Sequence, residues 1–242
     1  MARRRKRKQA PGPLRRALRL SRTGVLLFVG LSVAWVLWYR LAPVGGTTQM
    51  GLRQLEGQAV DRTWVPLEEV SPHLVRAVIA AEDARFCEHP GFDLEQMRVA
   101  WAEARAGGRA RGASTISQQT AKNAFLWSGR GPVRKGLEAW FTGLEELLWP
   151  KRRVMEVYLN VAEWGDGHFG AEAAAQARFG KPASALTATE ASLLAAVLPS
   201  PNKWRVDPPG PYVASRARTL RARMATVRRS GLAGCVLAAE AA

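Results

Sequence analysis

The chain has 242 residues and a formal net charge of +16 at pH 7, from 36 Lys and Arg against 20 Asp and Glu. Ten of the basic residues and no acidic residue fall within residues 1–22, which leaves a net charge of +6 for the rest. Because the excess lies in one tail before an apolar run, it favours a membrane-topology signal over nucleic-acid binding, and we expect no nucleic-acid partner.

The first predicted element is a transmembrane anchor over residues 23–41. Residues 23–39 carry no charge over 17 positions, at the lower end of the roughly 17–25 residues needed to cross a bilayer. Aromatic residues cluster at its outer end, and the basic tail 1–22 precedes its inner end. We therefore expect a cytoplasmic tail, one uncleaved anchor and an external remainder. A cleaved signal peptide is the alternative, disfavoured because residues 41–44 contain no good small-x-small site.

About 199 residues follow Pro43, enough for one domain with its own core, and we expect that domain to cover residues 44–242. These residues are too few for a second catalytic domain, and we expect none. The two cysteines, Cys87 and Cys235, do not form a spacing pattern typical of a disulfide framework. We predict neither a metal site nor a required disulfide.

Helix signals dominate the domain, and alternating strand patterns are almost absent, so we predict an all-α fold. Ser, Thr and Asp stand at N-cap positions, Pro at first helical positions, and Gly after several last turns. The predicted helices cover residues 72–86, 93–107, a segment opening at Thr115, 132–149, 151–161, 170–179, 187–198 and 211–231.

Four segments combine acidic, amide and cationic side chains. In the first, residues 82–91, Glu82 ends an apolar helical stretch and is predicted to share a helical face with Phe86 at i+4. Burial at such a place raises the pKa of a carboxyl, which suits a general base near neutral pH. The alternative is a helix-end carboxylate paired locally with Arg85 or His89.

In the second segment, residues 112–123, Thr115 and Gln118 have the spacing of a capping box. The hydroxyls and amides at this helix N-terminus are followed one turn later by Lys122. This pattern predicts a cradle for sugar hydroxyls and an anion.

The third and fourth segments, residues 134–138 and 151–165, are ambiguous when each is taken alone. Arg134 and Glu138 are i,i+4 neighbours that could form only a surface pair. Glu156 and Asn160 have the same spacing and could stabilise only their own helix.

Together, the segments closely resemble the peptidoglycan glycosyltransferases, and within them the single-domain monofunctional biosynthetic peptidoglycan transglycosylases, related to the glycosyltransferase domain of class A penicillin-binding proteins. The resemblance covers about residues 58–229. Four patterns carry it in order: E-D-x-x-F-x-x-H-x-G from Glu82, G-x-S-T-I-x-Q-Q-x-x-K-N from Gly112, R-K-x-x-E from Arg134, and E-x-Y-L-N from Glu156.

This resemblance implies a largely helical, lysozyme-like fold with two lobes. It implies polymerisation of lipid II into β-1,4-linked glycan strands, with inversion at the donor anomeric carbon and release of undecaprenyl diphosphate, for cell wall biogenesis. The implied location is the cytoplasmic (inner) membrane, with the catalytic domain periplasmic. The implied partners are lipid II, the lipid-linked glycan strand, the membrane, and cell-division or elongation synthases.

The resemblance also assigns residues. Glu82 is the expected general base and Glu138 a second catalytic residue, whose role as acid, metal ligand or orienter stays open. No cofactor is required by the sequence, and a divalent ion (Mg or Mn) at the diphosphate stays an alternative. The expected substrate-binding residues are Asp83, Phe86, Ser114, Thr115, Gln118, Gln119, Lys122, Asn123, Arg134, Lys135, Glu156 and Asn160.

A lysozyme-like lytic enzyme that cleaves peptidoglycan is the nearest alternative, but it has no use for a cationic diphosphate site. Two further segments have open interpretations. Residues 125–127 (Phe-Leu-Trp) are expected either to enter lipid or to pack in the core. The last helix carries arginines that face either anionic lipid or water: Arg216, Arg218, Arg221 and Arg223.

Overall fold

The computed structural model describes residues 12–108, 112, 114–129 and 131–237, and its described part is mainly helical, as predicted. Beside the helices it contains two 3₁₀ turns, Leu67–Glu69 and Ala183–Ala185, and two short parallel strands, β1 (Asp61–Arg62) and β2 (His168–Phe169). The helices are α1 (Pro13–Leu41), α2 (Thr48–Leu55), α3 (Pro72–Glu82), α4 (Leu94–Arg105), α5 (Ile116–Phe125), α6 (Pro132–Leu148), α7 (Lys151–Val161), α8 (Ala171–Phe179), α9 (Ala188–Val197) and α10 (Pro211–Arg229).

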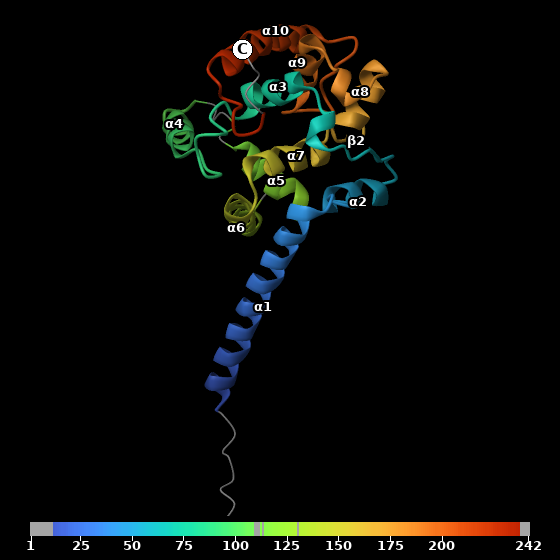
Figure 1. The fold of residues 1–242 in the computed structure, drawn as a ribbon. Helices are drawn as coiled ribbons and strands as arrows, with labels where there is room; N and C mark the ends of the chain where they lie inside the picture. Colours follow the sequence, from blue (N-terminus) through green and yellow to red (C-terminus); the bar gives the residue numbers. More distant parts are fainter. Residues whose placement is uncertain (1–11, 109–111, 113, 130, 238–242) are drawn as a thin grey trace, which may run out of the picture.

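Helix α1 extends away from the rest of the chain as a single rod (Figure 1). It has 29 residues and is the one described helix that is long and apolar enough to cross a membrane, by length and composition. It begins at Pro13, ten residues before the predicted anchor, because proline at a first helical position is followed by residues that favour helix. The predicted tail is therefore helical from residue 13, and its residues 1–11 lie outside the described part.

The outer end of α1 belongs to the core of the domain. Val36 is fully buried, and the indole nitrogen of Trp149 donates a hydrogen bond of 2.8 Å to its carbonyl oxygen. The ring of Trp35 meets Phe125 edge-on, and Phe125 stacks on Phe141 at 4.6 Å between ring centroids. Phe125 and Leu126 are thus core residues, as the packing interpretation predicted, whereas Trp127 is 43% exposed.

The domain has two layers (Figure 1). In the layer next to α1, α5 packs between α6 and α7, while in the outer layer α3 packs against α9 and α10. Every residue of α3 from Leu74 to Ala80 is buried, because the helix is covered on all sides by these neighbours. The residues after Ala80, at the end of α3, therefore lie at the boundary between the two layers.

The structure corrects the predicted end of α3. The helix stops at Glu82 and not at Phe86, since Asp83 leaves the helical conformation and uses its side chain to bind the start of α5. Phe86 is consequently not an i+4 neighbour of Glu82 on a helix. The short helix α2, capped by the Thr47 side chain, was not predicted.

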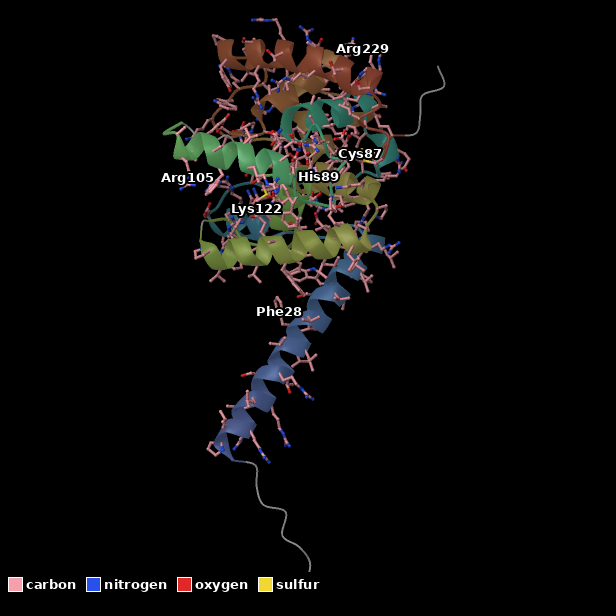
Figure 2. All side chains as sticks on the ribbon, turned by 90° about the vertical axis from the view of Figure 1, so that its left-hand side faces the viewer. Phe28, Cys87, His89, Arg105, Lys122 and Arg229 are labelled. Carbon is pink, nitrogen blue, oxygen red and sulfur yellow. A yellow bond between two sulfur atoms is a disulfide. The ribbon has the colours of Figure 1, made fainter. Side chains whose placement is uncertain are left out.

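The sequence analysis required no disulfide and left open whether the arginines of the last helix face lipid or water; the structure gives an answer on both points. Cys87 and Cys235 form a disulfide, because the chain after α10 returns to the turn that follows α3. The basic helix α10 lies at the end of the domain opposite α1 (Figure 1), so its arginines do not face the membrane that α1 would cross. Figure 2 shows the same separation from the side, with Arg229 far from Phe28.

Candidate active site

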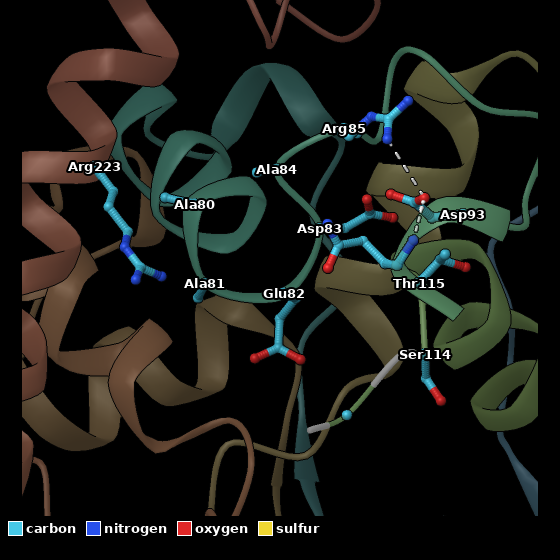
Figure 3. A pocket seen from close by; sticks show the side chains of 12 residues that line it. Ala80, Ala81, Glu82, Asp83, Ala84, Arg85, Asp93, Ser114, Thr115 and Arg223 are labelled. Atoms are coloured by element: carbon cyan, nitrogen blue, oxygen red, sulfur yellow. Dashed lines mark hydrogen bonds and ion pairs between the residues drawn. The ribbon is translucent and has the colours of Figure 1, made fainter. Parts of the chain in front are cut away.

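Glu82 lies at the edge of a pocket of about 260 Å³ at the boundary between the two layers. The pocket is bounded by the end of α3, the start of α4, the segment before α5, and α10. Figure 3 shows the Glu82 side chain extending from the helix end into the space between Arg223 and Ser114. The described lining residues are Ala80, Ala81, Glu82, Asp83, Ala84, Arg85, Asp93, Gln96, Gly112, Ser114, Thr115 and Arg223.

Burial raises the pKa of the Glu82 carboxyl, as the sequence predicted. The main opposing contribution is a hydrogen bond of 2.8 Å that the Gln119 side-chain amide donates to Glu82. The positive charges of Arg216 and Lys122 also lower this pKa, and Asp83 raises it. Glu82 is therefore a desolvated carboxyl with one donor and two nearby cations, an environment that suits a general base.

Gln119 is itself held from the other side by Tyr158. The hydroxyl of this tyrosine lies 3.5 Å from the Gln119 side-chain oxygen, and the tyrosine ring is almost completely buried. Burial, and secondarily the charge of Glu82, raises the pKa of Tyr158 well above its usual value, so it stays a neutral donor. Tyr158 orients the Gln119 amide toward Glu82, a role that the sequence analysis did not assign although the residue stands in the fourth pattern.

Asp83, expected to bind substrate, has its oxygens occupied by the protein. One lies 3.0 Å from the His89 ring nitrogen Nε2, and the other accepts a bond of 3.1 Å from the backbone N–H of Ile116. Asp83 thereby ties the turn after α3 to the first turn of α5. The residue positions both segments and also lines the pocket, and its direct contact with substrate stays a prediction.

Phe86, Thr115 and Gln118 are also buried structural residues. Thr115 and Gln118 form the predicted capping box, and the Thr115 hydroxyl additionally donates to the Gly91 carbonyl oxygen at 2.6 Å. The Lys151 ammonium lies 4.4 Å from the centre of the Phe86 ring. Thr115 and Gln118 hold the start of α5 in place. Thr115 also lines the pocket, as does the exposed Ser114 just before it.

A cationic cluster follows one turn along α5. Lys122 is half-buried, and this partial burial lowers its pKa, while Glu138 and Glu82 raise it and Arg134 and Lys135 lower it. Glu138 is 3% exposed, pairs with Arg134 at 2.8 Å, and also pairs with Lys135. The cluster of Lys122, Arg134, Lys135 and Glu138 has three cations and one carboxylate, and Lys122 connects it electrostatically with Glu82.

The donor set of this cluster does not fit a divalent metal ion. Each oxygen of Glu138 already faces a cation, Arg134 on one side and Lys135 on the other. Among the described residues no group of three or more His, Cys, Asp or Glu is placed to hold a metal. An excess of fixed positive charge is suited to an anion instead.

The remaining predicted residues lie elsewhere. Asn160 is fully buried, and its side-chain amide bonds both the N–H and the carbonyl of Val65 at 2.9 Å. Glu156 pairs with Arg153, which itself binds the carbonyl of Tyr39 at the end of α1. The chain itself thus uses the Asn160 amide, and Glu156 belongs to the junction with the anchor. Substrate binding by these two residues stays a prediction. Asn123 is buried in α5 and does not line the pocket.

Two arginines of α10 belong to the site, which the sequence analysis missed. Arg223 lines the pocket, and the charge of Arg216 acts on Glu82. A second hollow of about 240 Å³, lined by residues that include both arginines and Tyr212, extends along α10 from the pocket. The two arginines are seven residues apart, two helical turns, so a shared face was the available signal.

Comparisons with known proteins identify the family of this chain. The family described as Transglycosylase matches residues 48–227. A biosynthetic peptidoglycan transglycosylase of Rhodospirillum centenum is 54% identical over 228 residues, covering 94% of this chain and 97% of the relative. Proteins of the same name from Caulobacter vibrioides and Pseudomonas fluorescens are 53% and 52% identical, each over 87% of this chain and covering 92% and 90% of the relatives.

Proposed function

This chain belongs to the transglycosylase family and is a peptidoglycan glycosyltransferase, and we propose that Glu82 is its general base. The observation that carries the assignment is the desolvated Glu82 carboxyl, which lies in a pocket and is coupled through Lys122 to a cluster with excess positive charge. A base and an anion site side by side are what transfer of a sugar from a diphosphate requires.

In the proposed reaction, Glu82 accepts the proton of the acceptor 4-hydroxyl of lipid II. The hydroxyl oxygen attacks the donor anomeric carbon from the face opposite the diphosphate, which inverts the configuration and gives a β-1,4 bond. The bond between the anomeric carbon and the diphosphate oxygen breaks, and undecaprenyl diphosphate leaves. A well-placed base contributes about 10²- to 10⁴-fold to such a rate.

The departing diphosphate gains negative charge, and we propose that Lys122, Arg134 and Lys135 stabilise it by charge-assisted hydrogen bonds. Glu138 has the role of an orienter, because its buried carboxylate holds Arg134 and Lys135 together on one face of α6. No divalent ion is needed to neutralise the leaving group in this proposal. Ser114 and Gln119 line or border the pocket and are the proposed contacts for sugar hydroxyls.

We propose that the domain lies on the periplasmic side of the inner membrane. The basic tail before α1 favours a cytoplasmic N-terminus. The Cys87–Cys235 disulfide supports the same orientation, because disulfides persist in oxidising compartments and are rare in the bacterial cytoplasm.

The test is polymerisation of labelled lipid II by the detergent-solubilised full chain. Wild type is expected to produce glycan strands, and Glu82→Gln to lose about 10²- to 10⁴-fold in rate. Glu88→Gln, which neutralises an exposed carboxylate on the same turn, is the control and is expected to keep its activity. Cleavage of purified sacculi by wild type, with no polymer formed, would instead establish the lytic alternative.

A further inference from the structure

Another hollow, of about 520 Å³, lies at the outer end of the anchor and is separate from the hollow along α10. Its volume is within the range of small-molecule sites. It is enclosed by the linker after α1, helix α2 and the segment around β1, and it shares no lining residue with the catalytic pocket. Figure 1 shows α2 beside the outer end of α1. Much of its wall is glycine and apolar: Pro43, Val44, Gly45, Gly46, Met50 and Gly51.

Arg62 is the one charged residue in this wall. Its guanidinium donates one hydrogen bond to the carbonyl of Val44 and one to that of Gly45. Two of its five N–H groups are used in this way, and the N–H on Nε is buried without a partner in the described part of the chain. Donors therefore remain for a further acceptor.

The charge of Arg62 is not balanced by a carboxylate. No ion pair joins it to any described acidic residue, whereas neighbouring Arg153 pairs with Glu156 at 3.0 Å. Burial lowers the pKa of Arg62, and the opposing contribution comes from Tyr39 and not from an acid. A half-buried guanidinium with open space beside it is suited to an anion.

The position of the hollow indicates where such an anion comes from. Its wall begins at Pro43, two residues after α1 ends, so in a bilayer crossed by α1 it lies at the level of the lipid headgroups. Trp64 also lines it, with the guanidinium groups of Arg62 and Arg153 at 5.4 and 5.2 Å from its ring centre. Tryptophan and arginine together are typical of the membrane interface.

We propose that this hollow binds the phosphodiester headgroup of an anionic phospholipid, with Arg62 as the cation that recognises the phosphate. The apolar and glycine wall accommodates the glycerol portion of the lipid. The site fixes the linker and α2, and through them the height of the domain above the membrane.

The experiment compares lipid retention by the full chain. Delipidated protein in neutral detergent is mixed with phosphatidylglycerol or phosphatidylcholine of identical acyl chains, and bound lipid is counted by native mass spectrometry. Wild type is expected to retain several-fold more phosphatidylglycerol. The ten cations of the basic tail are present in every variant, so differences between variants report the hollow and not the tail.

Two variants test the charge and the space separately. Arg62→Gln removes the cation, with Arg98→Gln on the exposed surface of α4 as the charge-matched control. Gly51→Leu fills the hollow and leaves Arg62 in place, since a Cβ on Gly51 meets no atom within 4 Å. Gly51→Ala is its control, because it changes helix propensity while leaving most of the space open.

The proposal requires both Arg62→Gln and Gly51→Leu to lose the preference for phosphatidylglycerol, and both controls to keep it. Retention of the preference in either test variant overturns it, as does the absence of a preference in wild type. Soluble glycerol phosphate is added as a competitor. Complete displacement of the lipid by this competitor at equal concentration would show a site for free phosphate esters and overturn the lipid assignment.

Discussion

The largest contribution that opposes desolvation of Glu82 is a hydrogen bond of 2.8 Å from Gln119. Desolvation favours the neutral acid, which is inactive as a base, and the Gln119 amide favours the carboxylate. Tyr158 keeps this amide in the required orientation. We therefore expect Gln119, which is not the base itself, to influence the pH range in which Glu82 acts.

Replacing Gln119 by leucine is expected to raise the pKa of Glu82 further, because the carboxylate loses its donor. The acid limb of the pH profile of kcat/KM then moves to higher pH. Activity below neutral pH falls about tenfold more than it does at high pH, the value of one hydrogen bond to a charged group. Loss of the proposed sugar contact of Gln119 acts equally at every pH. Gln176→Leu on exposed α8 is the control, and an unmoved acid limb in Gln119→Leu contradicts the assignment.

Glu145 of α6 is a buried carboxyl that the proposed reaction does not use. It is fully buried, and neither of its oxygens has a hydrogen-bond partner in the described part of the chain. Burial, and secondarily Glu146, raises its pKa well above the usual value, while Lys151 lowers it. The folded state thus holds this proton more tightly than the unfolded state, so the stability of the fold decreases as pH rises from the usual glutamate range through the raised pKa.

Glu145→Leu is expected to raise the melting temperature in detergent, by the equivalent of about 1–3 kcal/mol for an unpaired buried polar group. The difference in melting temperature between variant and wild type increases from acidic to alkaline pH. Wild type loses stability as the pH rises, because buried Glu145 resists deprotonation, whereas leucine has no proton to lose. Thermal unfolding of both proteins across this range measures it. Glu69→Gln, on the exposed surface, is expected to show no such trend, and a gain independent of pH would contradict the assigned pKa direction.

At the scale of elements, the two capping boxes have different consequences for function. Thr115 caps α5, which carries Gln119 and Lys122, whereas Thr187 caps α9, which carries no residue of the site. The two caps have the same chemistry, since in each the threonine hydroxyl accepts from the backbone N–H three residues later. They differ in that Thr115 is buried and its hydroxyl also donates to the Gly91 carbonyl oxygen, whereas Thr187 is exposed.

Thr187→Ala is expected to cost about 1 kcal/mol of stability, measured by thermal unfolding. Thr115→Ala is expected to cost more, because it also loses the bond to the Gly91 carbonyl oxygen. Only Thr115→Ala is expected to reduce kcat, because the start of α5 sets the position of Gln119 relative to Glu82. Polymerisation assays well below the melting temperature separate the two effects. Equal loss of kcat in both variants would mean that stability alone accounts for the change.

At the scale of the whole molecule, the anchor and the C-terminal segment both complete the domain. The outer end of α1 buries aromatic residues of α5 and α6, so α1 is part of the fold as well as a tether. The disulfide joins the turn behind the catalytic pocket to the chain after α10, across 148 residues of sequence. It constrains nearly the whole domain in the unfolded state.

Reduction by a dithiol, or the double change Cys87→Ser with Cys235→Ser, is expected to lower the free energy of unfolding by about 2–5 kcal/mol. The melting temperature of the reduced protein in detergent measures this loss. Labelling of both thiols by maleimide in protein freshly isolated from membranes would contradict the disulfide. It would also contradict the periplasmic orientation that we propose.

Much of the fold and of the catalytic chemistry followed from the sequence, because the relevant signals are local. Caps, prolines and glycines act within one helical turn, which is why α7, and α8 with its closing Gly180, lie where predicted. The order of four short patterns identified the family, and the desolvation of Glu82 followed from the apolar run before it.

Only the tertiary structure decided which polar side chains reach the pocket. Asp83 lines the pocket but also binds the backbone N–H of Ile116, and the buried Asn160 binds Val65. Both partners are distant in sequence, and no local pattern reveals them. Arg223 enters the site from the last helix for the same reason. Local spacing determines which residues share a helix face, whereas long-range packing determines which parts of the chain that face contacts. The cysteine pair, the orientation of Gln119 and the anchor contacts all depend on long-range packing.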